Sequence, residues 1–139
     1  MSLTVQHMLN EIVPYGFVAA KLCLAAVFLY SGVDKLIHWR ESVREVVNLG
    51  LPMPGPFAGL TITTQLTGGI LVATGIEAAF GAALLAGFTV VATLLGHRFW
   101  LMHGEPAKKE FTTTLEHVAI IGGLILVIVD SLRVEGGIP

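Results

Sequence analysis

Four long apolar runs, separated by short polar stretches, dominate the pattern along this chain. The runs cover residues 12–33, 57–76, 78–96 and 112–132. A helix needs about 20 mostly apolar residues to cross the hydrocarbon core of a bilayer, where every backbone N–H must find its partner within the helix. The fourth run reaches that length only with its polar flank, which places Glu116 and His117 at one membrane boundary. The pattern therefore predicts four membrane-spanning helices.

Two features of the pattern indicate how these helices pack. Alternation of apolar and polar residues, typical of strands, is absent, and the connection at residues 75–77 is so short that the helices it joins must run antiparallel. Small residues recur along the predicted helices and allow their backbones to approach closely. They are Gly68, Gly69, Ala79, Ala82, Ala83, Ala86, Gly87, Gly122 and Gly123. We expect an all-α fold, an integral membrane antiparallel four-helix bundle, with residues 1–139 as a single transmembrane domain.

The composition supports a membrane protein and excludes several classes of partner. Of 139 residues, 54% are hydrophobic and only 13% are charged, which leaves too little polar surface to coat a soluble protein of this size. The formal net charge is -2 and no run of lysine and arginine is present, so we expect no nucleic-acid partner. The single cysteine, Cys23, excludes an intrachain disulfide and a Cys-x-x-Cys redox pair. Membrane lipid and other membrane or membrane-associated subunits are the expected partners.

Lysine and arginine are distributed unequally between the two sides of the predicted bundle. The loops after the first and third spans hold Lys35, Arg40, Arg44, Arg98, Lys108 and Lys109. The opposite side holds only Arg133, with Lys21 near it inside the first span. Basic residues in short loops remain on the cytoplasmic side of the membrane. We therefore predict a bacterial inner-membrane protein with cytoplasmic long loops and periplasmic termini.

Polar side chains gather where the predicted spans reach the cytoplasmic side. The candidates are Ser31, Lys35, Gln65, His97, Trp100 and His117. If the helix faces that carry them turn inward, these residues enclose a polar pocket at the cytoplasmic edge. An imidazole can donate one hydrogen bond while accepting another, and ionisable groups at such depths tend to be functional. The six residues form a candidate ligand site, and a quinone headgroup is the ligand considered.

Structural roles are the alternatives for the same residues. The ammonium of Lys35 can extend from a helix end to the lipid headgroups, and Trp100 can lie in the interfacial aromatic belt. The amide of Gln65 can join two helices by a hydrogen bond. His97 and His117 can be boundary residues whose role is only to satisfy neighbouring polar groups.

Lys21 lies deeper in the first span, where an unpaired ammonium is unfavourable. We expect it to pair with Glu77, Asp130 or Glu11, and a proton-relay role is the alternative. No single helix carries a His-x-x-x-His or Glu-x-x-His spacing, so we expect no metal site.

Five short segments occur in an order that belongs to a known pattern. They are FLYSGVDKL, GLPMPGP, GGILVATG, TLLGHRFW and HVAIIGGLILVI. Over about residues 17–130 the chain resembles the DoxX family of small bacterial membrane proteins, which is related to the DoxD subunit of thiosulfate:quinone oxidoreductase. The resemblance implies a four-helix inner-membrane protein. The family's Ser-Gly-x-x-Lys-Leu and His-x-Phe-Trp segments correspond to Ser31, Gly32, Lys35 and Leu36, and to His97, Phe99 and Trp100.

Two positions depart from the family pattern. Relatives usually bear a glutamate in the second helix where this chain has Gln65, which removes a titratable group from the bundle. The fourth helix of relatives often opens with Lys-Asn, where this chain has Glu116 and His117. Both changes weaken the transfer of a proton-coupled role from relatives to this chain.

The residues and the resemblance support two functions of different classes. The first is an accessory subunit of a membrane oxidoreductase system that binds quinone at the cytoplasmic edge, with His97 donating to a carbonyl and Lys35 stabilising negative charge. The second is a non-catalytic scaffold or assembly subunit that stabilises a larger membrane complex through its small-residue faces. No haem, dinucleotide or iron–sulfur motif supports independent catalysis, so the sequence leaves open whether the chain is an enzyme.

Overall fold

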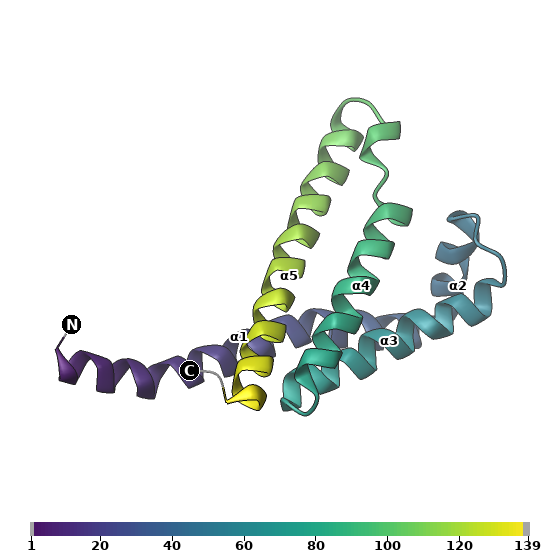
Figure 1. The fold of residues 1–139 in the computed structure, drawn as a ribbon. Helices are drawn as coiled ribbons and strands as arrows, with labels where there is room; N and C mark the ends of the chain where they lie inside the picture. Colours follow the sequence, from purple (N-terminus) through teal and green to yellow (C-terminus); the bar gives the residue numbers. More distant parts are fainter. Residues whose placement is uncertain (1, 138–139) are drawn as a thin grey trace.

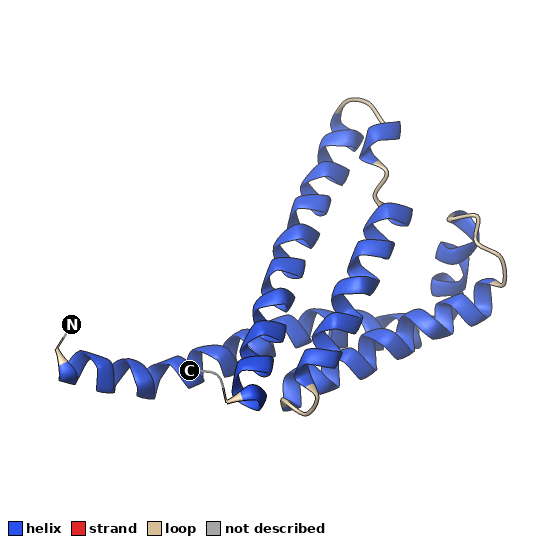
Figure 2. Cartoon of the chain, in the orientation of Figure 1, coloured by secondary structure: helices blue, strands red, loops and turns tan. Residues whose placement is uncertain are grey.

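The computed structural model describes residues 2–137, and helices make up most of them (Figure 1, Figure 2). In chain order the helices are α1 (Leu3–Ile37), α2 (Trp39–Asn48), α3 (Pro54–Thr74), α4 (Ala78–Gly96), the short 3-10 helix η1 (Phe99–Leu101) and α5 (Glu105–Gly136). No strand occurs within residues 2–137. The all-α fold expected from the sequence is confirmed.

Within the described residues, four segments are long and apolar enough to cross a membrane: α1, α3, α4 together with η1, and α5. The spans expected at 12–33 and 112–132 lie inside α1 and α5, which extend beyond them at both ends. The span expected at 78–96 coincides with α4, and the one expected at 57–76 is shifted by a few residues in α3. Large apolar side chains cover the outer surfaces of these helices, as expected where the surroundings are lipid.

Proline and glycine set the two ends of α3. Pro54 and Pro56 lie in its first turn, where a backbone N–H would have no partner within the helix. At the other end Gly75 has a φ of 77°, a left-handed conformation that stops the helix. The chain turns at once into α4, so α3 and α4 form the antiparallel hairpin that the short connection predicts.

Helix α2 is the element that the hydrophobic pattern does not predict. Only a loop is expected between the first two spans, and this expectation is wrong for ten of its residues. The signal is a short amphipathic repeat in which Ser42 and Val46, four residues apart, are buried. The buried side of α2 packs mainly on α3, near the end of α1.

Among the long helices, α1 packs on α3, α3 packs on α4, and α4 packs on α5. A smaller contact joins α1 to α5. The core where they meet consists of Ala25, Phe28, Val72, Ala78, Ala82, Leu85, Leu124 and Val127. In Figure 1, α4 and α5 stand as an antiparallel pair at an angle to α1 and α3, and the loop between α4 and α5 lies away from α2.

Small residues bring α3 and α4 close together, as expected for Gly68. A Cβ added at Gly68 would lie 2.6 Å from Cγ of Leu85, a side chain that is itself fully buried. Ala82 is also fully buried in this contact region. Ala83 and Gly87, in contrast, are exposed, so this part of the small-residue pattern on α4 is not covered by other helices of the described chain.

An ion pair joins α1 to α5. Nζ of Lys21 lies 3.2 Å from a carboxylate oxygen of Asp130, and less than a fifth of each side chain is exposed. Asp130 is one of the three partners expected for Lys21, so that prediction is confirmed. The pair stabilises the contact between α1 and α5 within their membrane-spanning lengths.

Candidate functional site

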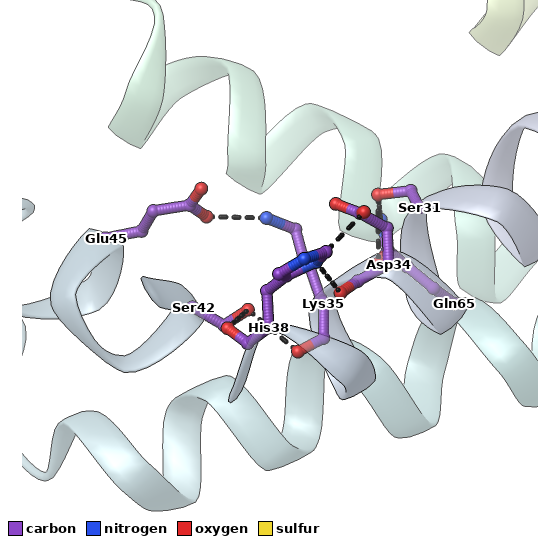
Figure 3. Close-up of polar contacts among 7 residues, drawn as sticks. All are labelled: Ser31, Asp34, Lys35, His38, Ser42, Glu45 and Gln65. Atoms are coloured by element: carbon purple, nitrogen blue, oxygen red, sulfur yellow. Dashed lines mark hydrogen bonds and ion pairs between the residues drawn. The ribbon is translucent and has the colours of Figure 1, made fainter. Parts of the chain in front are cut away.

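Two of the six candidate residues join α1 to α3. Nε2 of Gln65 donates a hydrogen bond to Oγ of Ser31 over 3.1 Å, as Figure 3 shows. Gln65 is 5% exposed, and Gly32 beside Ser31 is buried against the same helix. An amide bonded across two helices in this way has the interhelical role considered for it, because leaving it unpaired in an apolar environment would be unfavourable.

Lys35 is held by α2. Its Nζ lies 2.5 Å from a carboxylate oxygen of Glu45, and the hydroxyl of Ser42 donates to the backbone carbonyl of Lys35 over 2.9 Å (Figure 3). Three quarters of the lysine side chain is covered. Reasoning from the sequence did not include Glu45 or Ser42, because both depend on α2. The spacing of Glu41, Ser42 and Glu45 within a short amphipathic segment is the signal that could have indicated them.

A cleft of about 510 Å³ opens between α2, α3 and α4, and Lys35 lies on its lining. Its walls are mostly apolar and include Val46, Phe57, Leu84, Phe88, Val91 and Leu95. Lys35, Ser42 and Glu45 form its charged corner, and Thr61 and Thr64 add hydroxyl groups from α3. The arrangement suits an amphiphilic molecule with an apolar body and a polar head that accepts hydrogen bonds.

The two candidate histidines meet between α4 and α5. Nδ1 of His97 lies 2.5 Å from a carboxylate oxygen of Glu110, and the rings of His97 and His117 meet edge to face with centroids 4.9 Å apart. Nδ1 of His117 lies 2.8 Å from the hydroxyl oxygen of Thr93. Sequence reasoning did not include Glu110, which approaches His97 only because the chain reverses between α4 and α5.

The partners of the two rings fix where their protons lie. The hydroxyl of Thr93 has one hydrogen, and it lies 2.6 Å from the backbone carbonyl of Thr89, which can only accept. His117 must then donate from Nδ1 to the Thr93 oxygen. His97 likewise donates from Nδ1 to the carboxylate of Glu110. In both rings Nε2 is the nitrogen that these contacts leave free.

Helix α4 lies between the two groups of candidate residues. Phe88, Val91 and Leu95 face the cleft, whereas Thr93 is on the opposite side and contacts His117 of α5. The structure therefore places Ser31 and Gln65 at the contact of α1 with α3, Lys35 one helical turn further along α1 against α2, and His97 and His117 in a histidine cluster between α4 and α5. It brings Ser31 to Gln65 and His97 to His117, but it does not bring these candidates into one pocket.

Trp100 belongs to neither of these groups. It lies in η1, about half exposed, and its ring meets that of Phe99 edge to face with centroids 5.2 Å apart. This position fits the aromatic-belt role considered for it. Within residues 2–137, no group of three or more His, Cys, Asp or Glu side chains is arranged to hold a metal ion.

Comparison with known proteins agrees with this architecture. The sequence profile of the DoxX family matches residues 16–98, which include Ser31, Lys35, Gln65 and His97 but end before His117. A relative, the inner membrane protein YphA of Escherichia coli (strain K12), is 23% identical over 118 residues, which cover 85% of this chain and 84% of the relative. No solved structure matches the chain significantly. The relative and the four apolar segments support a multi-pass inner-membrane location. The chain belongs to the DoxX family of membrane proteins.

Proposed function

We propose that this protein is an accessory subunit of a membrane oxidoreductase system and binds an isoprenoid quinone in the cleft between α2, α3 and α4. The observation that carries the proposal is the position of Lys35, whose ammonium lies where the apolar walls of the cleft end. A site of about 510 Å³ falls within the roughly 300–1,000 Å³ range typical of small-molecule pockets.

The chemistry of a quinone matches this cleft. A quinone ring has two carbonyl oxygens that accept hydrogen bonds, and an ammonium group has three N–H donors, of which Glu45 engages one. Lys35 can therefore donate to a carbonyl while keeping its ion pair. The positive charge also favours the reduced ring, on which negative charge develops as electrons arrive from an oxidoreductase partner.

The apolar walls of the cleft suit the isoprenoid tail of a quinone. Phe88, Val91 and Leu95 present one continuous side of α4 to the cleft, opposite Phe57 of α3. An isoprenoid chain that leaves this groove enters lipid directly, because the cleft opens at the outer surface of the helices. In this proposal the histidine cluster stabilises the α4–α5 pair and does not contact the quinone.

A variant that fills the cleft tests the proposal. Gly87 lines the cleft and has no atom within 4 Å of an added Cβ, so Gly87→Phe is expected to fold normally and occupy the space of the ligand. Gly122→Phe on α5 is the matched control, because Gly122 is equally open but lies outside the cleft. Each protein is purified in mild detergent, and its quinone content per mole is measured by solvent extraction and chromatography.

We expect quinone in the wild type and in Gly122→Phe, and its loss in Gly87→Phe. Lys35→Met should weaken binding of a short-chain ubiquinone by about 10- to 100-fold, since a hydrogen bond to a charged group contributes roughly 1.5–3 kcal/mol. Wild-type protein that yields only phospholipid and does not bind the added ubiquinone would remove the proposal.

A scaffold function remains the second candidate, and one observation favours it. Ala83 and Gly87 are exposed on α4, where a helix of another subunit could approach closely. Purification that retains a stoichiometric membrane partner, together with full activity of that complex when Lys35→Met is present, would support the scaffold function, because Lys35 lines the cleft but is not part of the Ala83 and Gly87 face. Loss of the complex's quinone-linked activity in the same variant would support the quinone site.

A further inference from the structure

Helix α1 is longer than a membrane span requires, and its first third extends beyond the other helices. At about 1.5 Å per residue its 35 residues extend roughly 52 Å, whereas the hydrocarbon core is about 30 Å thick. Every residue from Ser2 to Gly16 is exposed. In Figure 1 this part of α1 runs beyond the other helices toward the N-terminus. No other helix of the described chain covers it.

This segment has an apolar side and a polar side. With about 3.6 residues per turn, one side of the helix carries Val5, Met8, Leu9, Ile12, Val13 and Tyr15. The opposite side carries Gln6, His7, Asn10 and Glu11. A helix with this division does not project stably into water, because its apolar side would remain hydrated.

The two sides continue the two sides of the membrane-spanning part of α1. The apolar side is in helical register with Val27, Tyr30 and Val33, which are exposed on the lipid-facing side of the span. The polar side is in register with Ala25 and Phe28, which are buried in the helix contacts. The apolar side is therefore a continuation of the surface that already contacts acyl chains.

That register determines how the segment meets the bilayer. When the segment bends outward, away from the other helices, the side that faced lipid in the span becomes the side that faces the bilayer. That side is the apolar side, so the polar side faces water. Pro14 lacks the N–H that would bond the carbonyl of Asn10, so the helix bends most easily there.

We propose that residues 3–13 lie on the membrane surface as an amphipathic anchor, with Val5, Leu9 and Ile12 inserted between the lipid headgroups. The partner is the lipid interface itself. The segment has Glu11 and no lysine or arginine, so apolar insertion and not attraction to anionic lipid holds it there. Its contact with lipid should be the same in neutral phosphatidylcholine vesicles and in vesicles containing phosphatidylglycerol.

Site-specific fluorescence tests this anchor. In a Cys23→Ser background, which removes the exposed native thiol, cysteines are introduced one at a time by Leu9→Cys, Ile12→Cys, His7→Cys and Asn10→Cys. Each protein is labelled with bimane and reconstituted into vesicles. Leu9 and His7, and likewise Ile12 and Asn10, are two residues apart and lie on opposite sides of the helix.

We expect nitroxide lipids labelled near the headgroup to quench bimane several-fold more at the Leu9 and Ile12 positions than at His7 and Asn10. Aqueous iodide should show the reverse order. Equal iodide quenching on both sides would mean that the segment projects into water and would overturn the proposal. Disulfide-linked dimers of Leu9→Cys without lipid quenching would also overturn it, because a second copy would then cover the apolar side.

Discussion

At the scale of single residues, the ion pair between Lys21 and Asp130 shows how this chain tolerates charge within its membrane-spanning lengths. The two side chains are mostly covered and meet at 3.2 Å between α1 and α5. An isolated ammonium or carboxylate at that depth would be strongly unfavourable, whereas an opposed pair neutralises both charges. The charges therefore stabilise the helix contact only while both are present.

Removal of one member of this pair should be more harmful than removal of both. We expect Asp130→Asn to lower the free energy of unfolding by about 3–5 kcal/mol, the typical effect of leaving one buried charge unpaired. Lys21→Met combined with Asp130→Leu should recover most of that loss. Unfolding in mixed micelles, followed by circular dichroism, measures the three proteins against wild type.

One outcome of the double-mutant comparison would contradict this prediction. A double variant as unstable as the sum of its single variants would mean that the two charges do not act together. Glu11→Gln is a suitable control, because Glu11 is exposed on the first part of α1 and forms no ion pair with another residue of the described range 2–137.

Residue-level contacts could be predicted only where few partners were available. Lys21 has few carboxylates near its end of the molecule, so Asp130 was one of three expected partners. Glu45 and Glu110 were not expected, because each reaches its partner only after the chain has reversed direction, at α2 or after η1. Sequence periodicity places a side chain on one side of a helix but does not give the path of a loop.

At the scale of elements, the contact between α3 and α4 depends on a glycine, which has no side chain. Gly68 allows Leu85 to pack so closely that no Cβ fits between them. Because Leu85 is fully buried, its side chain has no free space to move into. The short turn at Gly75 then joins the two helices where their surfaces already match.

Gly68→Ala should therefore separate α3 from α4. Alanine favours a helix by about 1 kcal/mol over glycine, but overpacking of a close contact destabilises by roughly 1–3 kcal/mol, so a net loss of stability is expected. Gly122→Ala provides the control, because an added Cβ there meets no atom within 4 Å. It should keep or slightly raise the melting temperature in detergent. Equal melting temperatures of the two variants would contradict the close contact.

The pattern of apolar residues predicts elements that cross the membrane and misses one that does not. All four long helices follow from run length, since the backbone of a span must be satisfied internally. Helix α2 has only ten residues and a polar majority, and its stability comes from packing of Ser42 and Val46 against its neighbours. Such tertiary stabilisation leaves only a weak local signal.

At the scale of the whole molecule, basic residues lie mainly at one end of the bundle. Lys35, Arg40 and Arg44 are at the end of α1 or on α2, and Lys108 and Lys109 are in the first turns of α5. The positive-inside tendency retains such residues in the cytoplasm. We propose that the loops carrying α2 and η1 are cytoplasmic and that both ends of the chain are periplasmic.

Reporter fusions test this orientation. Alkaline phosphatase fused after Gly137 should be active, and green fluorescent protein at the same position should be dark, because the first folds only in the periplasm and the second only in the cytoplasm. A fusion within the loop at Gly104 should give the opposite pair of results. A fluorescent C-terminal fusion with inactive phosphatase would reverse the proposed orientation.

The whole-molecule arrangement of the candidate site was the hardest to predict. Helical periodicity placed the six candidate residues in one pocket, on the assumption that all four helices turn these sides toward one centre. The angle between the α4–α5 pair and α1–α3 decides otherwise, and it depends on close contacts such as Gly68 with Leu85. Packing sets the crossing angles between helices, and the positions of polar residues along the sequence do not predict these angles.

The position of α4 between the cleft and the histidine cluster gives the two sites one shared rigid support. A molecule that tilts or rotates α4 on entering the cleft also displaces Thr93 and His97 relative to His117 and Glu110. If a ligand moves α4 in this way, thermodynamic linkage makes the effect reciprocal, and a displacement of Thr93 and His97 would alter affinity in the cleft by the same factor. A single helix would then couple the two sites, and no further moving part is needed.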